Sequence, residues 1–419
     1  MKRDVFFRAI CILFISCSFV NAQEPVSFTE INGTIIDQKS KDKLVFADLV
    51  INGSNISTVS NTDGGFTLKV PNHLLDSTLI ITHLGYQKLE LKISDISKNE
   101  KIYLNPSIIF LDEVKIASKF PNAKALVIET LSKKNTLYND NNVLMTAFYR
   151  ETIKNRRKNA SLSEAVVQIH KQPYKNSRND DIELIKARKK THYSRLDTLA
   201  LKLQGGPFSN LYIDIVKYPE YIFDNENIGF YDFSFDESTQ IDNSLVYVVN
   251  FQQKKGVETP LYFGKLYIDA ENLALKSAVY SLNVKNKKLA SELYVRKKPK
   301  KADVYPTEAT YRVNYRTQNG KWQYAYSNIL LTFKVNWQGK LFNSVYTLNS
   351  EMAVTDWKVM DTKLVRNKSM LLPNTILTEQ VSGFSDPKFW GEYNIIEPEK
   401  SIETAIEKIK KQLERTEPL

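Results

Sequence analysis

The stretch NTDGGFTLKVP, residues 61–71, places one acidic residue and two glycines within a β-rich part of the chain. This composition is typical of a ligand loop, so metal and phosphate binding are tested first. An EF-hand-type calcium loop would put its first and last ligands at Val59 and Val70, whose side chains cannot coordinate a metal. A phosphate loop needs the pattern GxxxxGKS or GxxxxGKT before a helix, whereas here the pattern is absent and a strand follows. Both kinds of ligand loop are therefore excluded.

A tight turn accounts for the same residues. The Asp63-Gly64 pair supplies the positive φ of a hairpin, after which Phe66 and Leu68 point to one face of a strand. Around this turn, residues 27–105 alternate short apolar runs with Gly, Asn and Asp at close spacing. That spacing is typical of an antiparallel sandwich, so we expect a β-sandwich over residues 27–105.

Four motifs in this region occur in a fixed order: GTIID (33–37), ADLVI (47–51), SNTDGGF (60–66) and ITHLGY (81–86). Together they resemble the carboxypeptidase regulatory-like domain, a transthyretin-like β-sandwich common in exported proteins of Bacteroidetes. The later LDEV (111–114) is similar to the segment that follows this domain in many such proteins, including TonB-dependent transporters. The resemblance implies a sandwich that is not itself catalytic.

The N-terminus predicts export. A basic start, a short apolar run and small residues before Gln23 make residues 1–22 a predicted secretory signal peptide. The rival interpretation is a lipoprotein lipidated at Cys17. Both cysteines, Cys11 and Cys17, lie in this segment, so the mature chain would have no disulfide, thiolate zinc site or cysteine nucleophile. No later window is apolar enough for a transmembrane helix, and we expect the protein in the periplasm or at the outer membrane.

The formal net charge is +11, and the excess is concentrated in three clusters: KNRRK (154–158), KARKK (186–190) and RKKPKK (296–301). Nucleic-acid binding could use such clusters, but predicted export argues against that partner. Solvated loop ends are one explanation. Peripheral contact with anionic lipid or lipopolysaccharide through these basic loops is the other.

The rest of the chain predicts a second, larger β domain. A linker and helix occupy 106–142, with the helix at 121–135, and long alternating strands fill 143–355. So many adjacent strands favour one large antiparallel meander that curls, because a flat sheet of this width would not stay open. Residues 356–419 are irregular and end in a helix that starts near Ser401. The expected fold class is mainly β, with a transthyretin-like sandwich before a curved, half-barrel-like sheet and a few helices.

The hairpin GKLYIDAENLALK (264–276) resembles lipoprotein-carrier half-barrels, in which a curved antiparallel sheet wraps a helix and holds lipid tails. This resemblance transfers no ligand residue. Tyr, Phe and Trp recur at alternate strand positions and are expected on one face, either as core or as the lining of an apolar cavity. The candidate cavity-lining residues are Tyr267, Tyr280, Tyr311, Tyr315 and Tyr326.

The sequence contains none of the common catalytic motifs. No zinc-peptidase pair His-x-x-Glu occurs, and the nucleophile elbow GxSxG is missing. Acidic pairs that could serve a glycosidase are better explained as solvated positions. The residues considered were His73, His83, His170, His192, Asp180, Asp181, Asp232 and Asp236. We therefore predict no catalytic, cofactor or metal site.

Three functions remain open from the sequence. The first is a non-catalytic exported envelope protein, with the sandwich as an interaction module and the larger β domain as a scaffold that binds an envelope protein, a glycan or a lipid. The alternative is a periplasmic lipid or lipoprotein carrier with an apolar half-barrel cavity. The second alternative is a peptidase-associated hydrolase.

Overall fold

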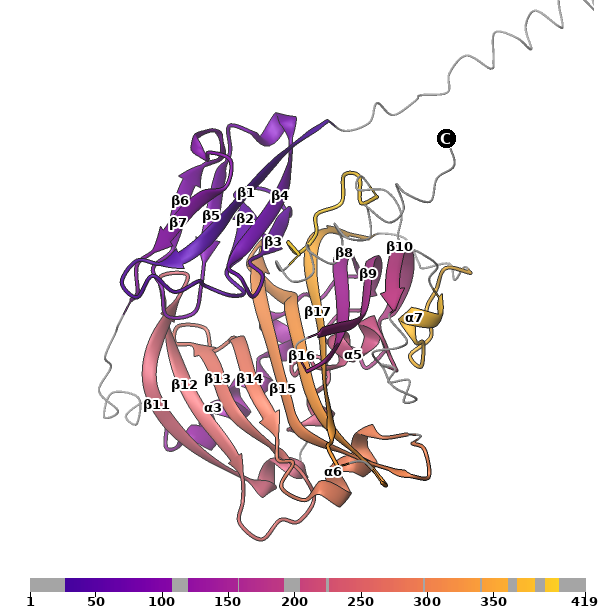
Figure 1. The fold of residues 1–419 in the computed structure, drawn as a ribbon. Coiled ribbons are helices and arrows are strands. Elements are labelled where there is room, and N and C mark those ends of the chain that lie inside the picture. The colour runs from indigo at the N-terminus through magenta and orange to yellow at the C-terminus, as the bar shows by residue number, and fades with distance from the viewer. Residues whose placement is uncertain are drawn as a thin grey trace, which may run out of the picture.

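Two packed sheets form the N-terminal part of the protein, drawn in indigo in Figure 1. The computed structural model describes residues 27–107, 120–156, 158–191, 204–223, 226–296, 298–339, 341–360, 368–380 and 389–398. The predicted signal peptide (1–22) and the predicted helix from Ser401 lie outside these residues. One sheet has the order β4-β1-β7 and the other β3-β2-β5-β6. The strands are β1 (Phe28–Asp37), β2 (Asp48–Ile51), β3 (Ser57–Val59), β4 (Gly65–Pro71), β5 (Thr78–Thr82), β6 (Leu89–Lys92) and β7 (Glu100–Leu104), with 3-10 turns η1 (Asn72–Leu74) and η2 (Ile93–Asp95).

The turn at residues 61–65 joins these two sheets. Its geometry is tight, since the Asn61 amide N–H donates to Gly65 O at 2.8 Å and Gly64 has a φ of 71°. However, β3 pairs with β2 whereas β4 pairs with β1, so the predicted hairpin is wrong. The sequence motif specifies the turn, but only the pairing partners tell a hairpin from a crossing between sheets. Phe66 and Leu68 are both buried in the sandwich core, as their alternation predicts.

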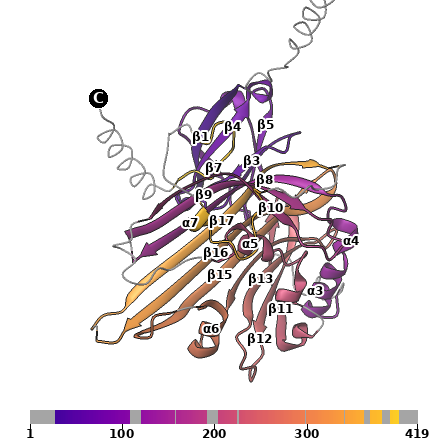
Figure 2. The same cartoon turned by 90° about the vertical axis from the view of Figure 1, so that its right-hand side faces the viewer.

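A third sheet, curved and antiparallel, forms the larger part of the protein (Figures 1 and 2). Within the described residues it has ten strands, in the order β10-β9-β8-β17-β16-β15-β14-β13-β12-β11, and it is not closed into a barrel. Its strands are β8 (Val143–Asn155), β9 (Lys158–Lys171), β10 (Asp181–Thr191), β11 (Tyr231–Ile241), β12 (Ser244–Gln253), β13 (Tyr262–Asp269), β14 (Leu275–Leu282), β15 (Ala302–Gln318), β16 (Lys321–Trp337) and β17 (Ser344–Val359). The predicted fold class is confirmed.

The sheet is not one continuous meander. Strands β11 to β17 follow one another in space as they do in sequence, but β17 then pairs with β8. The sheet thus consists of two meanders, β8–β10 and β11–β17, which are joined by the pairing of β8 with β17. Local alternation predicts each strand, but it carries no information on which distant strand pairs with which.

The two faces of the large sheet are covered differently. We call the face packed against the helices the helix side; its core combines α3 and α5 with strand residues such as Val249, Tyr280 and Met352. The opposite face, which carries the sandwich, is called the sandwich side. The helical segments are α3 (Ala123–Ser132), α4 (Lys134–Leu137), α5 (Pro207–Tyr212), η4 (Pro219–Tyr221), η5 (Asn227–Phe230), α6 (Lys287–Tyr294) and α7 (Leu377–Gln380). The helix predicted at 121–135 corresponds to α3 and α4, whereas the short helices α5 and α6 were not predicted. No described helix is long and apolar enough to cross a membrane.

The sandwich is fixed to one end of the large sheet. The Arg316 guanidinium pairs with Asp48 at 3.0 Å, and the Ser57 hydroxyl donates to Val354 O at 3.0 Å. Residues 389–398, which we call the C-terminal segment, run between the two parts and bond to both. The Asn61 side chain donates to Glu397 O at 2.9 Å, while Arg150 of β8 donates to Ile396 O at 2.7 Å. The turn at residues 61–65 is therefore part of an interface between three portions of the chain.

Candidate functional site

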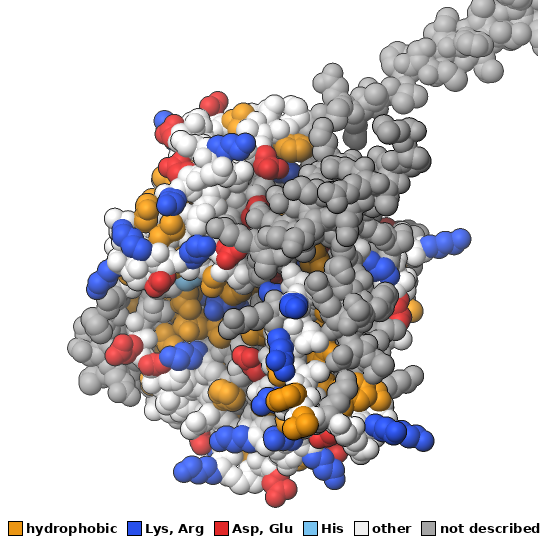
Figure 3. All heavy atoms as spheres, in the orientation of Figure 1, with side chains coloured by type: hydrophobic (Ala, Val, Ile, Leu, Met, Phe, Trp, Pro, Cys, Tyr) orange, Lys and Arg blue, Asp and Glu red, His pale blue; other side chains and the backbone are white. Residues whose placement is uncertain are grey.

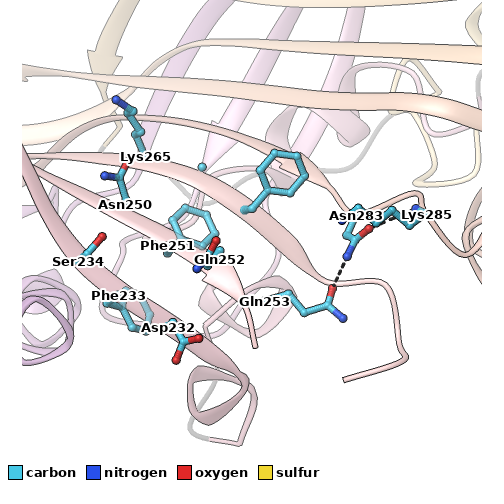
Figure 4. A pocket seen from close by; sticks show the side chains of 12 residues that line it. Asp232, Phe233, Ser234, Asn250, Phe251, Gln252, Gln253, Lys265, Asn283 and Lys285 are labelled. Carbon is cyan, nitrogen blue, oxygen red and sulfur yellow. Dashed lines mark hydrogen bonds between the residues drawn. The ribbon is translucent and has the colours of Figure 1, made fainter. Parts of the chain in front are cut away.

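An open depression of about 680 Å³ lies over β11, β12 and β13. The strand register places its exposed side chains on the sandwich side, where Asp232 lies opposite Gln252 and Asn250 lies opposite Lys265. This part of the face is solvent-accessible, unlike the part under the sandwich. The lining residues, most of them labelled in Figure 4, are Asp232, Phe233, Ser234, Asn250, Phe251, Gln252, Gln253, Phe263, Gly264, Lys265, Asn283 and Lys285.

One end of the depression is held rigid by the Gln253 side chain. Its Nε2 donates to Thr259 O at 3.0 Å, and its Oε1 accepts from the Leu261 amide at 3.0 Å. The same oxygen accepts from Asn283 Nδ2 at 3.2 Å, the bond drawn as a dashed line in Figure 4. A single amide thus fixes the loop between β12 and β13 and the residue after β14. This end of the depression is organised without a ligand.

The polar side chains of the depression combine hydrogen-bond donors and acceptors with three charged groups, Asp232, Lys265 and Lys285, and Asp236 lies beside Lys265. Lys265 Nζ lies 2.5 Å from Asp236 Oδ2, and this hydrogen bond lowers the pKa of Asp236 and raises the pKa of Lys265. Asn250 and Gln252 add amides, each of which can donate and accept. Phe263 contributes an aromatic ring that is 47% exposed. Such a surface suits a neutral, hydroxyl-rich ligand with an apolar face better than it suits a strongly charged one.

Lys265 and Asn250 belong to one row of directly opposed residues that crosses the whole sheet. The row runs Ser234, Asn250, Lys265, Val279, Arg312, Asn328, Glu351, Arg150, Glu164 and Arg188. The C-terminal segment covers its far end, where Arg150 binds both Glu164 (2.7 Å) and Glu351 (3.2 Å). Of the two ends of this row, the one on β11–β13 is the end that is open to solvent.

The covered end of the row is a buried ion network. Arg188 pairs with the second oxygen of Glu164 at 2.7 Å, so one carboxylate serves two guanidinium groups. Burial alone would raise the pKa of Glu164, but Arg150 and Arg188 outweigh it and the pKa is lowered. The charges are neutralised and enclosed. We therefore assign this network to structure rather than to ligand binding.

A second buried ion cluster lies on the helix side. Lys171 Nζ binds Asp180 at 2.9 Å and Asp214 at 2.8 Å, and all three side chains are inaccessible to solvent. Tyr174 and Tyr315 each donate a hydrogen bond to Asp214. These bonds satisfy the carboxylate and anchor the segment after α5 on the sheet. Asp180 was predicted from the sequence to be solvated. It is buried instead, because it pairs with Lys171 in this cluster.

Glu151 is the buried acid with the clearest perturbation. Burial raises its pKa to about 7, opposed by the hydrogen bond from Tyr149. The Tyr149 hydroxyl donates at 2.8 Å. A carboxyl with a pKa near neutrality could act as a general acid. Glu151 is fully enclosed on the helix side, however, so no substrate reaches it in this conformation.

The five candidate cavity-lining tyrosines fall on both faces of the sheet. Tyr280 and Tyr311 stack on the helix side at 5.1 Å between ring centroids, and Tyr315 lies on the same side. Tyr267 and Tyr326 lie on the sandwich side, where Tyr326 packs against Phe46 of the other domain. The expectation of one aromatic face is therefore wrong for these two. The alternation of a single strand does not say which of its faces joins which face of the next strand. A cavity-lining role for the five stays a prediction.

The histidines lie apart from one another in the described residues. His73 is exposed in η1, His83 has ring nitrogens within 3.0 Å of Val45 O and Leu84 O, and His170 lies 3.7 Å from Glu183. His192 lies outside the described residues. Among the described residues, no group of three or more His, Cys, Asp or Glu side chains could hold a metal ion.

The residues of the depression were not identified from the sequence, apart from the consideration of Asp232. A signal was present, because Asn250 and Gln252 are polar positions within the apolar β12 and Phe263 is an aromatic residue on the exposed face of β13. What was missing was the register that places three strands side by side. The basic clusters gave no indication of this site.

Comparisons with known proteins identify the first domain. Residues 31–116 match the family model of the CarboxypepD_reg-like domain, which confirms the resemblance drawn from the motifs. No curated protein matches the chain.

Solved structures give only low similarity. A LolA-superfamily protein from Nitrosomonas europaea is 12% identical, with 58% of this chain and 95% of that chain covered and a TM-score of 0.22. A putative outer membrane lipoprotein-sorting protein domain from Vibrio parahaemolyticus is 11% identical over 59% and 95%, with a TM-score of 0.25. A putative membrane-associated protein of unknown function from Bacteroides fragilis is 10% identical over 79% and 98%, with a TM-score of 0.15. With TM-scores this low, these similarities carry no information about the function of this chain.

Proposed function

We propose that this chain, which carries a CarboxypepD_reg-like domain, is a non-catalytic exported protein of the cell envelope that binds a glycan on its large sheet. The observation that carries the proposal is the open depression over β11–β13, with its amides and its exposed phenylalanine. Sugar hydroxyls both donate and accept hydrogen bonds, as the amides of Asn250 and Gln252 do. The C–H face of a pyranose ring is apolar and packs on an aromatic ring such as Phe263.

The sandwich acts in this proposal as a positioning module. It contacts the large sheet through the Arg316–Asp48 pair, the C-terminal segment and the hairpin between β11 and β12. At this hairpin the Gly85 amide donates to Gln240 O and the Lys88 amide donates to Asn243 Oδ1, both at 2.9 Å, and none of these residues lines the depression. Its attachment therefore leaves the depression open.

The experiment is binding of the purified chain to a panel of neutral and acidic oligosaccharides, followed by titration calorimetry on any that bind. Phe263→Ala should weaken binding about tenfold or more, because a stacked aromatic ring is a typical centre of binding energy. Phe230→Ala is the matched control, since Phe230 is 46% exposed in η5 and does not line the depression. Absence of binding to every glycan, or an equal loss in both variants, would contradict the proposal.

Lipid carriage on the helix side is the second candidate. It is favoured by Gly205 and Gly206, which have φ values of 101° and 49° directly before α5 and could act as a hinge for that helix. In the described structure Phe208 and Leu211 of α5 are buried against the sheet, so an acyl chain could enter only after α5 moved. Mass spectrometry of lipid extracted from protein purified from its native envelope tests this candidate. A stoichiometric lipid would favour carriage, and its absence would leave the glycan proposal.

A further inference from the structure

The hairpin between β16 and β17 exposes two large apolar side chains at its tip. Leu341 is 96% exposed and Phe342 is 78% exposed, the highest values among the large hydrophobic residues of the described chain. Both follow Gly339, whose positive φ of 84° belongs to the turn. Exposing two adjacent apolar side chains at the end of a long hairpin is unfavourable in water, which points to a partner surface.

Basic residues surround this tip. Arg156, in the turn between β8 and β9, donates from its amide to Val345 O at 2.9 Å and from its guanidinium to Asn343 O at 3.4 Å. On the other side of the hairpin, the Gln338 amide donates to Lys301 O at 3.0 Å. Two of the basic clusters of the sequence, 154–158 and 296–301, therefore flank the apolar tip. Figure 3 shows blue and orange side chains, with a few red ones, at the lower end of the molecule.

The charge of this region is strongly one-sided. Residues 154–158 and 338–343 contain no acidic residue. The acidic residues beside cluster 296–301 are the exposed Glu292 of α6 and Asp303, and Asp303 pairs with Lys298 at 3.3 Å. Lys158, Lys300 and Lys301 are exposed around the tip.

We propose that this tip docks on an anionic lipid bilayer, with Leu341 and Phe342 inserted among the headgroups and the flanking lysines and Arg156 against lipid phosphates. Charge complementarity favours this occupant, because an anionic bilayer offers an apolar layer directly beneath a negative surface. A protein groove would have to supply both features in a matching shape. The proposal is independent of the glycan site, since the depression lies on other strands.

The placement of the tip fits such docking. The sandwich contacts β17 at Val354 and Trp357, and the tip lies at the other end of this strand. Docking through the tip therefore leaves the sandwich directed away from the bilayer (Figure 1). Neither the C-terminal segment nor the sandwich contact surface needs to move.

Flotation of the full chain with vesicles tests the proposal. Wild-type protein should bind vesicles of phosphatidylglycerol and phosphatidylcholine, bind much less to phosphatidylcholine alone, and be released by salt. The double variant Leu341→Ser/Phe342→Ser should bind about 30-fold more weakly, because it loses the apolar insertion. Lys300→Ser/Lys301→Ser should weaken binding to the anionic vesicles about fivefold for each charge removed.

Two matched controls distinguish docking through the tip from nonspecific binding to vesicles. Leu372→Ser removes an apolar side chain that is 64% exposed elsewhere, and Lys98→Ser/Lys101→Ser removes two exposed lysines of the sandwich. Both controls should bind vesicles as wild type does. The proposal is overturned if wild type ignores the anionic vesicles, if it binds both vesicle types equally, or if the controls lose as much binding as the tip variants. Self-association through the tip, seen as a dimer that the double variant abolishes without any vesicle binding, would also overturn it.

Discussion

Replacing Glu151 by glutamine should stabilise the protein at neutral and alkaline pH but not at acid pH. Glu151 is enclosed on the helix side, where burial raises its pKa to about 7. A glutamine has nearly the same shape and can accept the Tyr149 hydrogen bond that the carboxyl accepts at 2.8 Å. It cannot ionise, so the variant removes only the dependence of stability on the charge at this position.

The magnitude follows from the difference between the folded and unfolded pKa values. The folded pKa of Glu151 lies above its unfolded value of 4.5. The contribution of Glu151 to the free energy of unfolding is therefore fully present below pH 4.5 and is lost as the pH rises through about 7. At 1.36 kcal/mol per pKa unit, the gap corresponds to about 3 kcal/mol in the free energy of unfolding. The difference in the free energy of unfolding between Glu151→Gln and wild type should therefore be about 3 kcal/mol larger above pH 7 than near pH 4.5, in favour of the variant.

Urea unfolding across this pH range, followed by tryptophan fluorescence, measures the difference. All four tryptophans lie in the large sheet or in the C-terminal segment, so the signal reports the part of the protein that contains Glu151. Glu292→Gln, at an exposed position of α6, is the matched control and should show no such pH dependence. A difference between Glu151→Gln and wild type that stays constant from acid to alkaline pH would refute the reasoning.

Two further substitutions test other parts of the sheet. Glu164→Gln should cost about 3–5 kcal/mol in urea unfolding at neutral pH, because Arg150 and its neighbouring arginine lose their shared carboxylate. The pKa of Glu164 is lowered in the fold, so its contribution to the free energy of unfolding is present above its ordinary pKa and is lost as the pH falls through the folded value. The difference in stability between wild type and variant should therefore disappear in acid. A difference that persists there would argue against the ion network. Gly264→Ala should lower the melting temperature and cost about 3 kcal/mol, because the new Cβ would lie 2.3 Å from Val279 O and 2.5 Å from Tyr280 Cα; an unchanged melting temperature would show that β13 and β14 can separate at that point.

The first domain was predictable because its signals are local. The turn at Asp63-Gly64 and the alternation around it lie within a few residues of one another, and they specify the same structure wherever the chain continues. The same holds for the Asn319-Gly320 turn, whose φ values of 49° and 75° form the hairpin between β15 and β16. Individual strands of the large sheet were found for the same reason.

What could not be predicted depends on contacts between distant segments. Arg150 and Glu164 occupy alternating polar positions in β8 and β9, which from sequence indicate a solvated face. They are buried because the C-terminal segment, more than 220 residues later in the chain, covers them. The candidate site was missed for a related reason, because Asn250, Gln252 and Phe263 form one surface only after the register of β12 and β13 is known.

The C-terminal segment also sets an order of events during synthesis. The sandwich comes first in the chain and has its own core, so it can fold before the large sheet is complete. The partners of Asn61 and Lys69 in the C-terminal segment are made more than 320 residues later. Until then the sandwich has folded but its docking surface stays open, and the exposed polar groups of β3 and β4 are accessible to other proteins. Assembly of the two parts is therefore one of the last steps in the production of this protein, and it coincides with the covering of the buried arginine network.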